Sequence, residues 1–174
     1  MIPSYLVGSF QRDTEGSSIN DKTYKPKLEK GPDIFCKSVI LLKKKYPNLK
    51  VLLSGSRRQF IMNELKRNNI EFYYFEMCDF NTLNELYNCL DLYIVASRVE
   101  GGPRAINECS LIKVPLLSTN VGIASLLCHS DSIFDMNNIE SILDCKTNID
   151  YNFEKAQEFL INNYMKKFND KIFS

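Results

Sequence analysis

Hydrophobic positions along the chain form short runs that alternate with longer stretches in which apolar residues recur every three or four positions. The short runs are typical of buried strands, and the periodic stretches are typical of helices with one face in the core. The run at 92–96 is apolar throughout, as expected of a strand buried on both faces. We expect strands at 4–10, 49–54, 70–75, 92–96, 114–118 and 132–134, and helices at 33–46, 59–68, 82–90, 104–111, 123–127, 139–143 and 151–172.

This alternation predicts a single α/β domain over residues 1–174, with a doubly wound, Rossmann-like parallel sheet covered by helices on both faces. Ligands of such sheets bind beyond the carboxyl ends of the strands. The segments that follow the expected strands are therefore where a site should be sought: 11–30, 55–58, 76–81, 97–103 and 119–123.

The segment at 11–30 is a long loop without hydrophobic periodicity. Loops longer than about 12–15 residues in a compact domain are usually functional or disordered. Because it contains Gly16, Ser17, Ser18 and Asn20, we expect part of it to be mobile.

Composition narrows the function classes. The 174 residues are 44% apolar, and 22 Lys and Arg against 21 Asp and Glu leave a formal net charge of +1. The apolar fraction disfavours a disordered chain. The near-zero net charge disfavours a broad basic surface, so we expect no nucleic-acid partner. No stretch approaches the roughly 18 apolar residues of a membrane span.

Cysteine and histidine usage bears on metal binding and on the compartment. The six cysteines include no C-x-x-C pair and the chain has one histidine, so no zinc site is expected. Several cysteines lie inside apolar runs, where a reduced thiol acts as a small hydrophobe, and the start of the chain lacks the pattern of a signal peptide. These features favour a cytoplasmic location.

The motif Ser-Arg-Val-Glu-Gly-Gly-Pro-Arg-Ala-Ile-Asn-Glu at 97–108 follows an expected strand and opens an expected helix. Gly101 and Gly102 permit close approach of a ligand, and the free N–H groups of the helix start suit a phosphate. Glu100 lies at the mouth of the loop and Glu108 about two turns along the helix, which suits two polar ends of one ligand with an anion between them. The alternative interpretation is a tight turn followed by a solvent-facing carboxylate.

Cationic residues also follow the first two strands. Lys27 and Lys30 precede a glycine and a proline at the start of a helix, where an ammonium could bind a phosphate oxygen or remain solvated. Arg12 follows the first strand closely enough to join the same anion site. Arg57 and Arg58 could either contact a phosphate or pair with an acidic residue at the surface.

Five segments together resemble the nucleotide-sugar-binding half of a GT-B glycosyltransferase, in the large retaining family 4 (glycosyl transferases group 1). They are VGSFQRDTEG at 7–16, LEKG at 28–31, LYNCLDLYIVAS at 86–97, the Glu-x7-Glu motif at 100–108 and STNVG at 118–122. The resemblance covers about residues 5–172 and implies a metal-independent enzyme that binds a nucleoside diphosphate sugar and transfers the sugar to an acceptor with retention of configuration.

The resemblance also implies roles for individual residues. Lys30 would hold the donor diphosphate, with Arg12 as a second cation and the backbone N–H groups of Gly101 and Gly102 at a phosphate. Glu100 would contact the transferred sugar, so that it and Lys30 are the catalytic candidates. The other donor contacts are Glu108, which would bind the ribose hydroxyls, and the segment near Phe75 and Met77, which would lie against the base.

Such enzymes also have an N-terminal acceptor-binding domain, which we expect to be absent from this chain because the donor-half motifs begin close to Met1. We therefore expect the chain to be the donor half of an enzyme, incomplete as a catalytic unit by itself. One alternative is a module that binds a nucleotide or sugar nucleotide without turnover. A dinucleotide-dependent oxidoreductase is disfavoured, because G-x-G-x-x-G does not follow the first strand.

Overall fold

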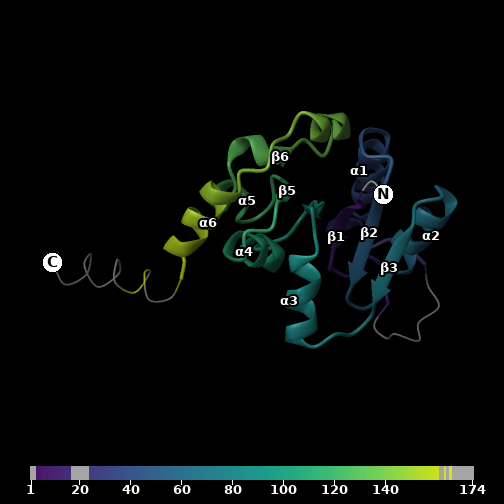
Figure 1. Ribbon diagram of the computed structural model, residues 1–174, viewed down its shortest axis with the longest axis horizontal. Helices are drawn as coiled ribbons and strands as arrows, with labels where there is room; N and C mark the ends of the chain where they lie inside the picture. Colours follow the sequence, from purple (N-terminus) through teal and green to yellow (C-terminus); the bar gives the residue numbers. More distant parts are fainter. Residues whose placement is uncertain (1–2, 17–23, 161–162, 164, 166–174) are drawn as a thin grey trace.

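The computed structural model describes residues 3–16, 24–160, 163 and 165. In these residues six parallel strands form one sheet in the order β3-β2-β1-β4-β5-β6 (Figure 1). This is the order of a doubly wound Rossmann sheet, so the predicted fold class is confirmed. The strands are β1 (Tyr5–Ser9), β2 (Leu49–Ser54), β3 (Phe72–Phe75), β4 (Leu92–Val95), β5 (Leu116–Thr119) and β6 (Ile133–Phe134).

Helices cover both faces of this sheet. Alternate strand positions point to opposite faces, so Val51 contributes to one core and the adjacent Leu52 to the other. The first core is covered by α1 (Pro32–Lys45), α2 (Gln59–Arg67) and the 3₁₀ helix η3 (Ile139–Leu143), and the second by α3 (Phe80–Asn88), α4 (Arg104–Leu111) and α5 (Ala124–Leu127). The order reverses between β1 and β4, and a crevice is expected at their carboxyl ends.

The predicted elements are present, with strand and helix bounds that differ by two residues or fewer except in the last helix. The structure starts α3 two residues early because Asp79 is its N-cap and accepts a hydrogen bond from the N–H of Thr82 at 2.7 Å. The segment at 139–143 forms a 3₁₀ helix instead of an α-helix.

The prediction of one unbroken helix over 151–172 is wrong. The helix α6 (Ile149–Glu158) begins two residues earlier and ends before Phe159, whose N–H bonds to the carbonyl of Ala156. Most of the remaining predicted helix, at 161, 162, 164 and 166–172, lies outside the described residues. Figure 1 shows α6 beside α4 and α5, against which it packs. No helix in the described ranges is long and apolar enough to cross a membrane.

The two ends of the long loop at 11–30 are joined. Thr14 and Pro26 form an isolated antiparallel bridge, and the loop ends in the 3₁₀ turn η1 (Leu28–Lys30). Residues 17–23, on which the expected mobility falls, lie outside the described residues.

Two buried arginines hold the first part of this loop. The guanidinium of Arg58 donates to the carboxylate of Asp13 at 2.5 Å and to the carbonyl of Ser54 at 2.7 Å. The N–H groups of Asp13 and Thr14 both donate to the carbonyl of Arg57. The predicted pairing with an acidic residue is found for Arg58, but it lies in the interior instead of at the surface, and both arginine side chains lie away from solvent.

We predict that Arg58→Ala lowers the free energy of unfolding by about 3–5 kcal/mol, because it leaves the buried carboxylate of Asp13 unpaired. Urea unfolding at neutral pH measures the change. The matched control is Arg67→Ala, which removes an exposed ion pair with Glu64 and should cost less than about 1 kcal/mol. Equal effects of the two substitutions would contradict a structural role for the buried pair.

Candidate functional site

A pocket of about 350 Å³ lies at the carboxyl ends of β1 and β4, at the point where the strand order reverses. Its lining comes from the segments after these strands, from Tyr93 of β4, and from α3 and α4. It is lined by Phe10, Gln11, Leu83, Tyr87, Tyr93, Glu100, Gly102, Pro103, Arg104, Ala105 and Glu108. The structure thus places much of the 97–108 motif where doubly wound folds bind ligands.

Two glycines in the left-handed region hold neighbouring segments against the loop that carries Glu100. Gly31 has a φ of 62°, and a Cβ atom there would lie 1.7 Å from the carbonyl oxygen of Ala96. Gly122 has a φ of 53°, and its Cβ would lie 2.4 Å from the carbonyl oxygen of Gly101. Only glycine tolerates both the conformation and the contact at these two positions.

Lys30 and Glu100, the two catalytic candidates, form an ion pair. The Nζ of Lys30 lies 2.5 Å from Oε1 of Glu100, and Oε2 of Glu100 accepts a hydrogen bond from the hydroxyl of Ser97 at 2.8 Å. The two charged side chains are 24% and 21% exposed. Glu100 lines the pocket and Lys30 does not, so the ammonium of Lys30 is connected to the pocket by this ion pair.

Glu108, in the second turn of α4, also lines the pocket, and Tyr87 orients it. The hydroxyl of Tyr87 donates to Oε2 of Glu108 at 2.6 Å. Burial raises the pKa of Tyr87, so this hydroxyl stays protonated at neutral pH and acts as a donor. The rings of Phe10 and Tyr93 lie 4.7 Å and 5.5 Å from that of Tyr87, centroid to centroid, and complete an aromatic wall.

The remaining predicted residues are placed differently. Gly102 lines the pocket and Gly101 precedes it in the same loop. Arg12 does not line it, and the buried Nε of Arg12 has no hydrogen-bond partner among the described residues. Phe75 is the last residue of β3 and Met77 follows it; β3 is separated from β1 by β2, and the two residues are 43% and 74% exposed. The pocket as it stands does not bring these three side chains to Glu100 and Glu108.

Among the lining residues that the sequence did not single out are Phe10, Tyr87 and Arg104. The two aromatic residues lie in an expected strand and an expected helix, where burial in the core and pocket lining give the same hydrophobic pattern. Arg104 begins α4, where the helix dipole disfavours a cation. That unfavourable placement is the signal that could have marked it as a ligand-facing residue.

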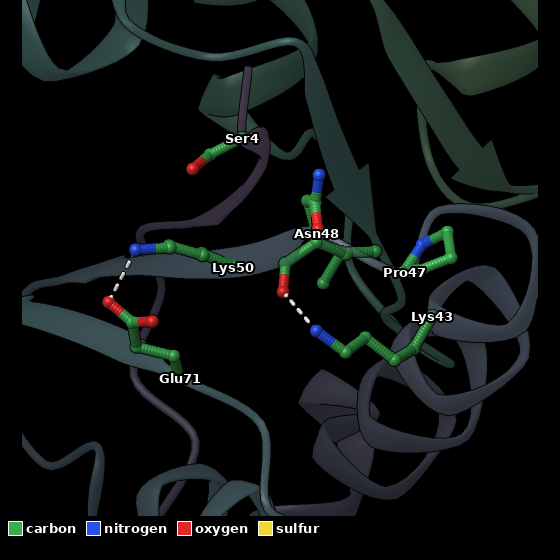
Figure 2. A pocket seen from close by; sticks show the side chains of 7 residues that line it. Ser4, Lys43, Pro47, Asn48, Lys50 and Glu71 are labelled. Atoms are coloured by element: carbon green, nitrogen blue, oxygen red, sulfur yellow. Dashed lines mark hydrogen bonds and ion pairs between the residues drawn. The ribbon is translucent and has the colours of Figure 1, made fainter. Parts of the chain in front are cut away.

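A second pocket, of about 410 Å³, lies at the amino ends of β1, β2 and β3 (Figure 2). The candidate site lies at the carboxyl ends of the strands, away from this pocket. Both of its lysine side chains bond to the protein itself. The Nζ of Lys50 pairs with Glu71 at 2.6 Å, and that of Lys43 donates to the carbonyl of Leu49 at 2.9 Å. The lining residues are Ser4, Lys43, Pro47, Asn48, Leu49, Lys50 and Glu71. We therefore place the candidate site in the smaller pocket, where a helix N-terminus and two carboxylates converge.

No group of three or more His, Cys, Asp or Glu side chains in the described part of the chain is arranged to hold a metal ion.

A sequence comparison with protein families decides which family this is. The model of the glycosyl transferases group 1 family matches residues 24–145, which include η1, the 97–108 motif and most of the sheet. The chain belongs to this family. A comparison with curated proteins finds no match.

Solved structures support the fold of this group 1 glycosyltransferase. The catalytic domain of cholesterol-α-glucosyltransferase from Helicobacter pylori is 16% identical, with a TM-score of 0.59 and 96% of each chain covered. The pneumococcal O-GlcNAc transferase GtfA is 18% identical with a TM-score of 0.64, and sucrose-phosphate synthase from Thermosynechococcus elongatus is 14% identical with a TM-score of 0.67. The match with GtfA covers 97% of this chain and 35% of GtfA. The match with the synthase covers 98% of this chain and 46% of the synthase. The expected Rossmann-like GT-B architecture is thereby confirmed.

We predict that Gly31→Ala destabilises the group 1 domain by more than about 1 kcal/mol, because alanine is strained at this φ and its Cβ meets a backbone oxygen. Gly101→Ala is the control, since no atom lies within 4 Å of its Cβ position. Thermal and urea unfolding of both variants measure the difference, and a Gly31→Ala variant as stable as Gly101→Ala would contradict the close packing described here.

Proposed function

We propose that this domain binds a nucleoside diphosphate sugar in the pocket at the carboxyl ends of β1 and β4, for transfer of the sugar to an acceptor with retention of configuration. Membership of the group 1 glycosyltransferases supports sugar transfer. The observation that carries the proposal is that one pocket is lined by Glu100, which pairs with Lys30, by the start of α4, and by Glu108 in the second turn of the same helix.

The diphosphate would lie between Lys30 and the N-terminus of α4. Backbone N–H groups of Gly101 and Gly102 and the positive end of the helix dipole suit phosphate oxygens, and the ammonium of Lys30 adds a charge-assisted hydrogen bond. As the bond between sugar and diphosphate breaks, negative charge grows on the leaving oxygen. Fixed positive groups at this place would stabilise that charge, and the proposal requires no metal ion.

Glu100 would hold the transferred sugar. Its position beside Lys30 places a carboxylate next to the proposed diphosphate, where the sugar of the donor begins. The hydroxyl of Ser97 fixes one carboxylate oxygen, while the oxygen that now bonds Lys30 becomes available when the ammonium turns to a phosphate.

Glu108 would bind the ribose. Tyr87 occupies one of its carboxylate oxygens and leaves the other for a ribose hydroxyl. The structure of the pneumococcal O-GlcNAc transferase GtfA is of a complex with UDP and GlcNAc, which supports a nucleotide of this kind for the present domain. Contacts of the base with the segment near Phe75 and Met77, and of the diphosphate with Arg12, stay predictions, because these side chains do not line the pocket.

Transfer itself would require an acceptor-binding domain. The domain spans 35–46% of several structures that it matches, among them GtfA and sucrose-phosphate synthase. This observation favours, as a second candidate function, donor binding without turnover by the domain alone. A donor hydrolysis and transfer assay discriminates the two: release of free sugar or product by the domain alone supports catalysis, and binding without release supports the second candidate.

We predict that Glu108→Ala weakens binding of the nucleoside diphosphate by about 1–3 kcal/mol, or roughly 5- to 150-fold, because hydrogen bonds to a charged acceptor are lost. Calorimetric titration measures the loss, and a 2′,3′-dideoxy nucleotide should show a much smaller one. Glu85→Ala, an exposed carboxylate of α3, is the control. Unchanged affinity of Glu108→Ala would remove this residue from the site.

We predict that Lys30→Ala lowers affinity for the nucleoside diphosphate about tenfold and leaves affinity for the nucleoside unchanged, because only the diphosphate uses the ammonium. Lys37→Ala, an exposed lysine on α1, should change neither value. If the Lys30 variant lost the two ligands equally, the ammonium would not be at the diphosphate.

A further inference from the structure

Arg98 connects the two segments that carry the ion pair of the site. Its guanidinium donates to both carboxylate oxygens of Asp33, in the first turn of α1, at 2.7 Å and 2.6 Å. The same Nη1 donates to the carbonyl of Leu28 in η1 at 2.9 Å. One side chain of the loop at 97–103 thus holds both the turn that carries Lys30 and the helix that follows it.

The backbone around Arg98 adds to this connection. The N–H groups of Arg98 and Val99 donate to the carbonyl of Glu29 at 2.8 Å and 3.2 Å, and the side-chain amide of Gln11 donates to the carbonyl of Lys30 at 3.0 Å. Each of the three carbonyls of η1 therefore accepts a hydrogen bond from a distant segment. Arg98 and Val99 bond two of these three carbonyls, which makes the loop at 97–103 the principal support of η1.

We propose that Arg98 is a positioning residue for the diphosphate site and that it acts through Lys30. This inference rests on the proposed function of the pocket. Arg98 does not line the pocket, so it has no direct access to a ligand there. By fixing η1 against its own loop it sets where the ammonium of Lys30 lies relative to Glu100 and the start of α4.

The geometry requires arginine. A planar guanidinium bonds both oxygens of one carboxylate and a carbonyl at the same time, whereas an ammonium cannot reproduce that fork. The hydrogen bonds from Arg98 lower the pKa of Asp33, so the carboxylate remains ionised at neutral pH and keeps the pair intact. Arg98→Lys is therefore expected to preserve the charge without restoring the position of η1.

A double-mutant cycle tests the inference. UDP, GDP and ADP are titrated calorimetrically to find the diphosphate that binds the wild-type chain, and this ligand and its nucleoside are then titrated into Arg98→Ala, Arg98→Lys, Lys30→Ala and the double variant. We expect Arg98→Ala and Arg98→Lys to lose about tenfold in diphosphate affinity and nothing in nucleoside affinity. In the Lys30→Ala background, Arg98→Ala should change the affinity less than twofold, because residues that act through one another are not additive. Arg67→Ala is the control for loss of an arginine–carboxylate pair.

A readout without a nucleotide tests the effect of Arg98 on Lys30 directly. Acylation of lysine amines, followed peptide by peptide with mass spectrometry, should show Lys30 reacting several-fold faster in Arg98→Ala than in the wild type, with Lys37 unchanged. Unchanged reactivity of Lys30, equal losses for diphosphate and nucleoside, or additive effects with Lys30→Ala would each overturn the positioning role. If the wild type binds none of the three diphosphates, the proposed function fails and the inference fails with it, whatever the acylation shows.

Discussion

The contact between Gly31 and the carboxyl end of β4 determines where the charged groups of the candidate site lie. A glycine in the left-handed region lets η1 approach the carbonyl of Ala96 more closely than any side chain would permit. That approach places Lys30, the last residue of η1, beside the loop that carries Glu100, and Gly122 holds the same loop from the other side. The positions of Lys30 and Glu100 are consequently set by the packing of the short backbone segments that carry them.

The electrostatic arrangement follows from this packing. Without a ligand, Lys30 is neutralised by Glu100, while Glu108 is held by the neutral hydroxyl of Tyr87. An incoming diphosphate would compete with Glu100 for the ammonium and would receive additional hydrogen bonds from the start of α4. The hydrogen bonds from the start of α4 would offset the free energy lost when the ion pair breaks. The positive groups are already oriented before the ligand binds, and electrostatic stabilisation of a leaving group requires such preorganisation. Glu100, released from Lys30, would turn to the sugar that the account places next to it.

The sequence was sufficient for the fold and for the centre of the site, because both follow from local patterns. Alternating strands and helices leave few topologies, and the 97–108 motif lies after a strand where ligands bind. The buried pair of Arg58 and Asp13 could not be predicted, since its two partners are 45 residues apart and arginine is ordinarily exposed. Tyr87 has the same pattern as a core residue, so its hydrogen bond to Glu108 appears only in three dimensions. The last helix was predicted as unbroken because its apolar spacing continues past Glu158, where α6 ends.

The most direct test of the central claim is calorimetric titration of the wild-type chain with UDP, GDP and ADP and with the matching nucleosides, first without metal and then with magnesium. The account predicts that one diphosphate binds without metal, at least about tenfold more tightly than its nucleoside, because the fixed positive groups at η1 and α4 contact only the phosphates. Magnesium should not be required for that preference. Equal affinities for a diphosphate and its nucleoside, or no binding of any diphosphate, would contradict an anion site between Lys30 and the start of α4.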